Sequence, residues 1–491
     1  MLILNEIIAW MKDPDSQQIC WITGMAGTGK TSIAKTICER ATTDAEIILG
    51  GSFFCSRTGI AAQRDIRCVV PTLAQLLARQ SIEFIRALVD EMARDRDVQH
   101  KHVTVQVNQL LYTPLLALKD SPRYIVFVID ALDECGSGAS VLDEEGHESV
   151  SELLEALVTS SPTSVELPVK FLVTSRPETH IRDTPVSDAE LSQILRLHAV
   201  NKEEVDSDIH RYITKTLDDK LSRKPAVRSQ FTETDVKALV QLCDGLFIVA
   251  ATVLKHTFGS GIDVAPAVFK GLLNDSRDGL DAEAAAPLDR IYESILRNAT
   301  RQNEPNTTKL SALQRLLGAI LSARMTLSIA ALAELLAQEP YVVRAGLSRL
   351  HAVVDVPDGD HVPGLRTVHA SFGDYLFNRA PNHIRISRSL GHETLALGCL
   401  DVMGKLLHFH ISQNKSSYDP NPPAQPDFIA LSLQYACLQW VYHVAALVDT
   451  VNLAATIGAI FRPKLLPWLE VMSLLRQVWR AAKCFSLQLA R

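Results

Sequence analysis

Two patterns of apolar positions divide the chain near residue 200. Before that point, short apolar runs alternate with longer segments in which apolar residues recur at helical spacing. The runs at 125–129 and 171–173 are apolar throughout and lack the alternation of a half-exposed strand. Strands covered on both faces have this pattern, so it indicates a mainly parallel sheet between layers of helices. We therefore expect a three-layer α/β domain over residues 18–200.

The expected elements of this domain alternate along the chain, as in parallel sheets. A helix at 1–17, stopped near Asp13 and Pro14, precedes the domain. Strands are expected at 20–23, 47–55, 124–129, 170–174 and 193–197. Helices are expected at 32–40, 69–96, 103–118 and 148–160.

After residue 200 the strand-like runs nearly disappear. Helices expected at 203–216 and 234–256 predict an all-α subdomain, which we place at 201–305.

Three compact helices between 309 and 350 then precede two short apolar runs, which the turn residues 357–360 separate. Three helices followed by a hairpin signal predict a winged-helix domain at 306–382. Residues 383–491 are expected to form a helical C-terminal region.

Residues 24–31 fit the phosphate-binding loop pattern of Gly, four residues, and Gly-Lys-Ser/Thr. An expected strand precedes the loop and an expected helix follows it, which is the setting that this motif needs. Its glycines let backbone N–H groups turn towards a phosphate, at the positive end of the helix dipole. In such a loop Lys30 reaches the β- and γ-phosphates, and the Thr31 hydroxyl can bind Mg²⁺. The residues expected to contact nucleotide are Gly24, Met25, Ala26, Gly27, Thr28, Gly29, Lys30, Thr31 and Ser32.

Two further apolar runs end in residues that suit the same chemistry. Asp130 ends the run at 125–129 and, with Thr31, could hold Mg²⁺ beside the loop. Asp133 or Glu134, just beyond it, could position or deprotonate an attacking water. Arg176 follows the run at 171–173, and the carboxyl ends of parallel strands meet in one crevice. An arginine there can bind a γ-phosphate, so we assign to hydrolysis Lys30, Asp130, Asp133, Glu134 and Arg176.

These motifs, in this order, resemble the NACHT-type STAND NTPases, specifically the fungal NOD-like receptor group with a nephrocystin-3-like N-terminal NTPase domain. The resemblance implies an ATP/ADP-operated switch with Mg²⁺, slow hydrolysis, and homo-oligomers on activation. It also implies a role in fungal innate immunity or self/non-self recognition. The segments that carry it are the loop with 21–24, then 51–57, 130–135, 174–177, 243–248 and 368–376.

The resemblance also implies a role for His369. In related switches, a histidine that opens the last helix of the winged-helix domain contacts the β-phosphate of bound ADP and stabilises the closed, inactive state. His369 follows the expected hairpin and occupies the matching place. The chain departs from the family at Phe247, close to where many relatives carry a proline that packs on adenine.

The composition of the chain limits which binding partners and which cellular compartment we expect. The chain of 491 residues is 47% hydrophobic and 21% charged, which is ordinary for a globular protein. A net charge of −7 gives no electrostatic reason to expect nucleic acid. Nine scattered cysteines, none in a CxxC pair, suit a reducing compartment better than a disulfide framework or a zinc site. With no recognisable signal peptide or membrane-length apolar window, we expect a cytoplasmic protein without a membrane partner.

Two other functional classes stay open. One is an interaction scaffold whose NTPase has decayed, against which the intact Lys30, Thr31 and Asp130 argue. The other is a kinase-type P-loop phosphotransferase, against which the winged-helix pattern argues. We recognise no array of WD, ankyrin or tetratricopeptide repeats, so the activating ligand is not predicted.

Overall fold

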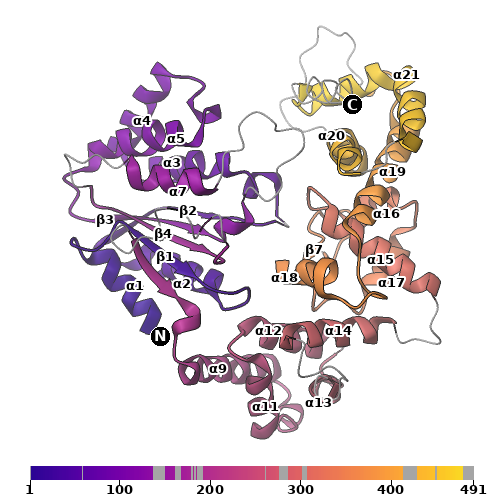
Figure 1. The fold of residues 1–491 in the computed structure, drawn as a ribbon, viewed down its shortest axis with the longest axis horizontal. Coiled ribbons are helices and arrows are strands. Elements are labelled where there is room, and N and C mark those ends of the chain that lie inside the picture. The colour runs from indigo at the N-terminus through magenta and orange to yellow at the C-terminus, as the bar shows by residue number, and fades with distance from the viewer. Residues whose placement is uncertain are drawn as a thin grey trace. The chain divides into compact units, whose positions relative to one another are not determined.

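The chain forms two compact units in the computed structural model (Figure 1). The first unit takes its residues from 1–139, 145–209 and 244–248, and the second from 140–144, 210–243 and 249–491. The structure describes residues 2–57, 59–135, 150–160, 167–178, 181, 184, 192–259, 261–275, 286–300, 307–412, 428–447 and 451–478.

A five-stranded sheet forms the middle layer of the first unit. Its strand order is β2-β3-β4-β1-β5, and every neighbouring pair is parallel. The predicted three-layer α/β fold with a parallel sheet is therefore confirmed. The strands are β1 Ile19–Thr23, β2 Ile47–Phe54, β3 Tyr124–Asp130, β4 Val169–Ser175 and β5 Ser192–Arg196.

Each face of the sheet is buried by its own helices. In β3, Phe127 belongs to the core with α3–α7, whereas Val126 and Val128 belong to the core with α1 and α2. The ring of Phe127 stacks on Phe171 of β4 with centroids 5.3 Å apart. Burial on both faces explains why these runs do not alternate. The helices are α1 Leu2–Lys12, α2 Lys30–Thr43, α3 Val69–Ala78, α4 Ile82–Arg94, α5 Val103–Gln106, α6 Thr113–Leu115 and α7 Val150–Thr159, with the π-helical turn η4 Val107–Tyr112 between α5 and α6.

The single helix expected at 69–96 is wrong, because two helices, α3 and α4, occupy this range. Ser81 is the N-cap residue of α4, and its side chain accepts a hydrogen bond from the N–H of Phe84 at 3.2 Å. Serine at an N-cap stabilises a new helix start, so it separates the two helices even though the apolar periodicity continues across it.

The single helix expected at 234–256 is also wrong. It is divided into α11 Glu233–Cys243 and α12 Phe247–Gly259. Between them, Asp244 and Gly245 have φ values of 44° and 78°, in the left-handed region that ends helices. At this break, residues 244–248 belong to the first unit, whereas the helices on either side belong mainly to the second.

The described residues of the second unit form helices and one hairpin. Its three helices α15–α17 precede β6 and β7, which pair antiparallel. This is the element order expected of a winged helix, an assignment that stays a prediction, as does the division into five domains. No helix among the described residues is long and apolar enough to cross a membrane. The elements from 200 onwards, besides α11 and α12, are α9 Lys202–Leu221, α10 Pro225–Arg228, α13 Ala265–Asp275, α14 Pro287–Thr300, α15 Thr307–Ser322, α16 Ile329–Leu335, α17 Pro340–Leu347, β6 Val354–Asp355, β7 Arg366–Thr367, α18 Ala370–Asp374, the π-helical turn η9 Tyr375–Arg379, α19 Arg388–Leu406, α20 Leu431–Ala445 and α21 Val451–Leu474.

Candidate functional site

The phosphate-loop sequence forms the turn between β1 and α2, at the carboxyl end of the sheet. Gly27 and Gly29 have φ values of 85° and 96°, which glycine adopts without a steric penalty. Gly29 is the N-cap residue of α2, so the N–H groups that start this helix without intrahelical partners adjoin the loop. The left-handed glycines and the helix start are the backbone features that the predicted phosphate-binding role of residues 24–31 requires.

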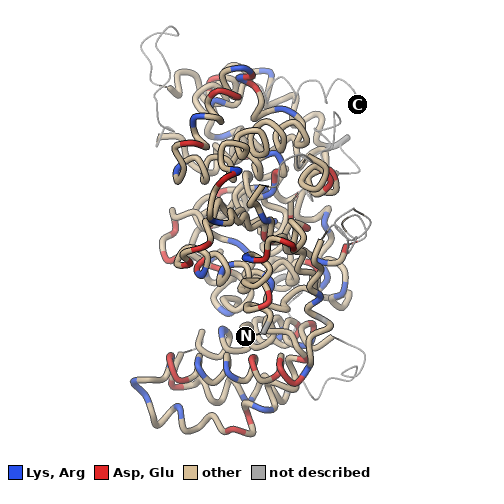
Figure 2. The backbone as a smooth tube through the Cα atoms, turned by 90° about the vertical axis from the view of Figure 1, so that its left-hand side faces the viewer, with Lys and Arg blue, Asp and Glu red and all other residues tan. Residues whose placement is uncertain are grey.

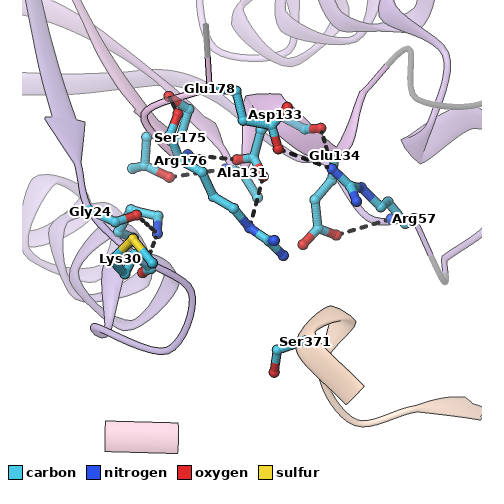
Figure 3. A network of polar contacts seen from close by, with 12 residues as sticks. Gly24, Lys30, Arg57, Ala131, Asp133, Glu134, Ser175, Arg176, Glu178 and Ser371 are labelled. Carbon is cyan, nitrogen blue, oxygen red and sulfur yellow. Dashed lines mark hydrogen bonds and ion pairs between the residues drawn. The ribbon is translucent and has the colours of Figure 1, made fainter. Parts of the chain in front are cut away.

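Lys30 lies beneath the loop and is buried. Its Nζ donates to the carbonyl oxygens of Gly24, at 2.7 Å, and Met25, at 2.9 Å (Figure 3). Burial lowers the pKa of the Lys30 ammonium, and the charge of Asp133 acts in the opposite direction. The other predicted loop residues lie nearer to solvent: Met25, Thr31 and Ser32 are exposed, and Ala26 and Thr28 are half-buried.

The two predicted magnesium ligands, Thr31 and Asp130, lie in contact. Asp130 is 1% exposed and accepts a hydrogen bond from the Thr174 hydroxyl at 2.6 Å, and the Thr31 side chain lies close enough to lower its pKa. Burial raises the pKa of the Asp130 carboxyl, and these two side chains oppose that shift.

The turn that follows Asp130 is strained. Ala131 has a φ of 53°, a left-handed conformation that costs an alanine on the order of 1 kcal/mol. Its N–H donates to the Thr174 hydroxyl at 3.0 Å. Thr174 therefore holds both the carboxylate and the turn after it, a role that sequence reasoning did not assign to this residue.

Asp133 and Arg176 form one unit at the same end of the sheet (Figure 3). One carboxylate oxygen of Asp133 accepts the backbone N–H of Arg176 at 2.9 Å. The other lies 3.2 Å from Nε of the Arg176 guanidinium. Since the side chain of Asp133 is only 2% exposed, this pairing fixes the direction of Arg176. Asp133 is thus placed to orient the arginine.

Glu134 is paired with Arg57, which follows β2 (Figure 3). Its Oε2 accepts the backbone N–H of Arg57 at 3.0 Å. The Arg57 guanidinium donates in turn to the carbonyl oxygen of Asp133 at 3.1 Å and approaches Glu178 at 3.5 Å. Burial raises the pKa of the Glu134 carboxyl, which makes it a stronger base than an exposed glutamate. The sequence signal for Arg57 is only an arginine directly after a strand.

The phosphate loop also has a cover that the sequence did not indicate. The N–H of Ile248 donates to the carbonyl oxygen of Gly27 at 3.2 Å. A Cβ added at Gly27 would lie 2.1 Å from Cγ2 of Ile248, and one added at Gly29 would lie 3.8 Å from the ring of Phe247. Phe247 and Ile248 therefore pack directly on the loop. Phe247 is the residue at which the sequence departs from the family pattern.

His369 belongs to the second unit, where it is the N-cap residue of α18. The other predicted site residues lie in the first unit, and the charges of Asp133, Arg176 and Asp130 all act on Lys30. The structure thus brings together Lys30, Thr31, Asp130, Asp133, Glu134 and Arg176.

Figure 2 shows lysine and arginine interspersed with aspartate and glutamate along the described chain, without a long run of one sign.

Comparison with known proteins shows what the chain is similar to. Residues 2–176 match the family model described as "Nephrocystin 3, N-terminal". The chain is 26% identical over 508 residues to the vegetative incompatibility protein HET-E-1 of Podospora anserina, a match that covers 94% of this chain and 34% of the relative. The chain therefore spans about a third of the length of that relative.

Two solved structures show weaker likeness. One is a STAND protein with a tetratricopeptide repeat sensor from Pyrococcus horikoshii, with a TM-score of 0.44, 12% identity, and coverage of 98% of this chain and 54% of that one. The other is the Drosophila ORC bound to DNA, with a TM-score of 0.27, 10% identity, and coverage of 78% and 96%. At these scores neither structure informs the fold or the function. The family match over residues 2–176 and the long alignment with HET-E-1 agree with the resemblance to the NACHT-type STAND NTPases that the motifs indicate.

Proposed function

We propose that the protein is a switch whose conformation depends on whether ATP or ADP is bound, and that it hydrolyses ATP slowly. One observation carries the proposal: a phosphate loop, a Thr31–Asp130 contact and an Asp133–Arg176 pair lie at one end of one sheet. Each of these groups suits a different part of a nucleoside triphosphate with its metal.

The residues present fit Mg²⁺ bound together with a nucleotide. Magnesium prefers oxygen ligands and is usually held by one or two protein groups plus phosphate oxygens. Thr31 and Asp130 supply such a hydroxyl and carboxylate in direct contact. Among the described residues, no group of three or more His, Cys, Asp or Glu could hold a metal without a further ligand. Magnesium bound there would neutralise phosphate charge.

The chain's own residues then have separate roles. Lys30, released from the carbonyl oxygens of Gly24 and Met25, binds the β- and γ-phosphates. Arg176, held by Asp133, binds the γ-phosphate. Glu134, whose pKa burial raises, accepts the proton of the attacking water. Of the two carboxylates considered for this step, we assign it to Glu134, whose Oε2 accepts the Arg57 N–H, because both oxygens of Asp133 face Arg176.

In the closed state we assign to His369 a contact with the β-phosphate of ADP. ATP then favours a second state, because Arg176 gains a γ-phosphate partner that ADP lacks. Opening allows homo-oligomers to form. The named role of HET-E-1 in vegetative incompatibility supports a role in self/non-self recognition. Deleting the gene in its host should remove an incompatibility reaction between strains, and unchanged fusion would contradict that role.

The switch is tested by the nucleotide that the protein carries. The full chain is purified in Mg²⁺ without added nucleotide, denatured gently, and the released nucleotide is identified by chromatography. We expect close to one ADP per chain, because a closed state that holds ADP exchanges slowly. Lys30→Ala should carry at least tenfold less, since the main phosphate-binding charge is lost.

A matched control is Lys35→Ala, which removes a lysine from α2 outside the loop and should leave the bound ADP unchanged. Wild-type protein that is as empty as Lys30→Ala, and that fails to bind added ATP or ADP, would favour the scaffold with a decayed NTPase. A guanine nucleotide in place of ADP would correct the choice of base.

A further inference from the structure

Two buried cysteines lie against each other beside the candidate site. Cys55 directly follows β2, and Cys135 directly follows the 3₁₀ turn η6, Leu132–Glu134. Their Sγ atoms lie 2.8 Å apart, although 80 residues separate them in the sequence. Cys55 is 5% exposed and Cys135 is 3% exposed. The cysteine spacing does not indicate this contact, because neither residue belongs to a CxxC pair.

Backbone hydrogen bonds hold the two thiols in place. The N–H of Cys55 donates to the carbonyl oxygen of Asp130 at 2.9 Å, which continues the pairing of β2 with β3. The N–H of Cys135 donates to the carbonyl oxygen of Leu132 at 3.0 Å, within the turn. The Sγ of Cys135 also lies 3.6 Å from the carbonyl oxygen of Gln63. Both thiols belong to one apolar core of the first unit, so their contact does not depend on the second unit.

This arrangement suits a disulfide bond. Such a bond is about 2.0 Å long, so the two sulfur atoms have to approach by only about 0.8 Å. Two groups held together in this way react with each other readily, because little translational freedom is left to lose. In reducing compartments, disulfides are usually transient and serve in catalysis or in redox sensing. A reversible bond is therefore compatible with the reducing compartment that we expect from the scattered cysteines.

We propose that Cys55 and Cys135 are a redox-sensitive site at which a hydroperoxide forms a reversible disulfide bond, and that this bond slows the hydrolysis of ATP. The thiolate of one cysteine attacks the peroxide, whose O–O bond breaks, and a sulfenic acid forms as an alcohol or water leaves. The second thiol displaces water from the sulfenic acid, and the S–S bond forms. Together the two thiols lose two electrons and two protons, which convert hydrogen peroxide into two molecules of water. A dithiol reverses the step by exchange.

The bond acts on the residue to which we assign proton transfer. Glu134 directly precedes Cys135, and its Oε2 accepts the N–H of Arg57, two residues after Cys55 (Figure 3). A covalent link between residues 55 and 135 ties these two backbone segments together and holds the Glu134 carboxylate on Arg57. A displacement of about 1 Å near a reacting group can cost roughly a hundredfold in rate. Formation of the bond rests on the first unit alone, whereas its effect on ATP rests on the proposed function.

Burial makes the reaction slow at neutral pH. Burial, followed by the hydrogen bond with Cys135, raises the pKa of the Cys55 thiol well above its ordinary value. Only the thiolate is the nucleophile, so the rate of oxidation should increase with pH. The site should therefore respond to sustained oxidation and not to a brief exposure.

The bond is tested by mass spectrometry of the full chain. The protein is reduced, desalted, treated with hydrogen peroxide at pH 7 and at pH 8, alkylated in denaturant, and digested without reductant. We expect a linked pair of peptides that contain residues 55 and 135, lighter by two hydrogen atoms than the separate peptides. The pair should form faster at pH 8, and dithiothreitol should remove it.

The matched control is Cys68→Ala, which removes a half-buried cysteine that packs on the same core. It should form the same linked pair as the wild type, whereas Cys55→Ser and Cys135→Ser should not. Wild-type protein without this pair, whether its thiols stay reduced, oxidise singly or pair elsewhere, would overturn the proposal.

Hydrolysis of ATP is then measured on the reduced and the linked proteins. We expect the linked wild type to hydrolyse ATP about tenfold more slowly, with unchanged retention of ADP, since the bond does not join residues 24–31. Cys135→Ser should keep the rate of the reduced protein after peroxide treatment, and Cys68→Ala should slow as the wild type does. An unchanged rate in the linked wild type would overturn the effect on hydrolysis. Wild-type protein that forms the link but binds no nucleotide would instead overturn the proposed function and leave the disulfide site standing.

Discussion

At the scale of single residues, the site depends on a few positions that have no freedom to change. Gly27 is the clearest example. Its φ of 85° is left-handed, and a Cβ added to it would lie 2.1 Å from Cγ2 of Ile248. Asp130 is another, because its buried carboxylate relies on the side chains of Thr174 and Thr31. Such residues decide binding through geometry, which neither composition nor periodicity records.

Gly27→Ala is expected to destabilise the first unit for two separable reasons. The left-handed backbone costs alanine about 1 kcal/mol, and the methyl group 2.1 Å from Ile248 adds roughly 1–3 kcal/mol of overpacking. Urea unfolding of Gly27→Ala, Ile248→Ala and the double variant measures both. Ile248→Ala should recover only part of the steric cost, because Cβ of residue 248 itself lies 2.8 Å from the added Cβ, and it should recover none of the backbone cost.

The control is Gly29→Ala, which has a φ of 96° and nothing closer than 3.8 Å to its added Cβ. Gly29→Ala should lose only the stability that corresponds to the left-handed backbone cost. Additive effects of Gly27→Ala and Ile248→Ala would contradict the contact, because residues that do not touch behave independently.

At the scale of elements, the sequence predicts strands better than helix ends. The five strands lie close to their predicted places, because long apolar runs are needed wherever a sheet is covered on both faces. The helix breaks at Ser81 and at Asp244 were missed, because each depends on one or two residues inside an unbroken apolar pattern.

In the candidate site too, the sequence predicts some features and misses others. Lys30, Thr31, Asp130 and Arg176 follow from motifs at strand ends, and the structure gathers them in one place. The pairings of Asp133 with Arg176 and of Glu134 with Arg57 did not follow, since they depend on side-chain directions after turns. The segment 243–248 was noted only for its resemblance to the family, and the contact of Ile248 with the loop did not follow from it, because an apolar residue that covers a loop looks like any residue of a helix core.

The packing of α19 on α20 contains a contact between two histidines, one of which is fully buried. His443 is fully buried, and its Nδ1 lies 3.0 Å from Nδ1 of His392. Its Nε2 lies 2.8 Å from the hydroxyl of Tyr435. Burial, followed by the charges of His392 and Arg324, lowers the pKa of His443 well below 6.5. Burial, with Arg324 and Arg388, also lowers the pKa of His392.

We expect the second unit to lose stability in mild acid. Below pH 6.5 the unfolded chain binds protons that folded His443 and His392 do not, so stability is present above that pH and falls as the pH is lowered. The slope is on the order of 1 kcal/mol per pH unit for each histidine. Urea midpoints between pH 5 and 8 measure this slope. His443→Gln should flatten it, and the exposed His361→Gln should not. Equal slopes in all three proteins would exclude this pair as the cause.

At the scale of the whole molecule, the two units carry different parts of the proposed switch. The first holds the phosphate loop and the groups around it, and the second holds His369. A switch of this kind has to link nucleotide identity to assembly, so its state should be visible in the size of the particle.

His369→Ala is therefore expected to favour larger assemblies in ADP, because the closed state loses a hydrogen bond to a charged phosphate. A loss of about 1.5–3 kcal/mol shifts a closed-to-open ratio roughly ten- to a hundredfold. Light scattering on a sizing column in Mg²⁺–ADP measures this. The exposed His408→Ala serves as a control that should elute like the wild type. A His369→Ala profile identical to the wild type, with ADP retained equally, would count against a role in the closed state.

The contact of Ile248 with Gly27 also determines when the packing around the loop can be completed during synthesis. The phosphate loop leaves the ribosome before the segment that covers it, which is synthesised roughly 10–40 s later at ordinary rates. Until then the first unit lacks one of its own pieces, and a fragment that stops at residue 209 would lack it permanently. A nascent chain should therefore acquire the covered loop only after residue 248 emerges.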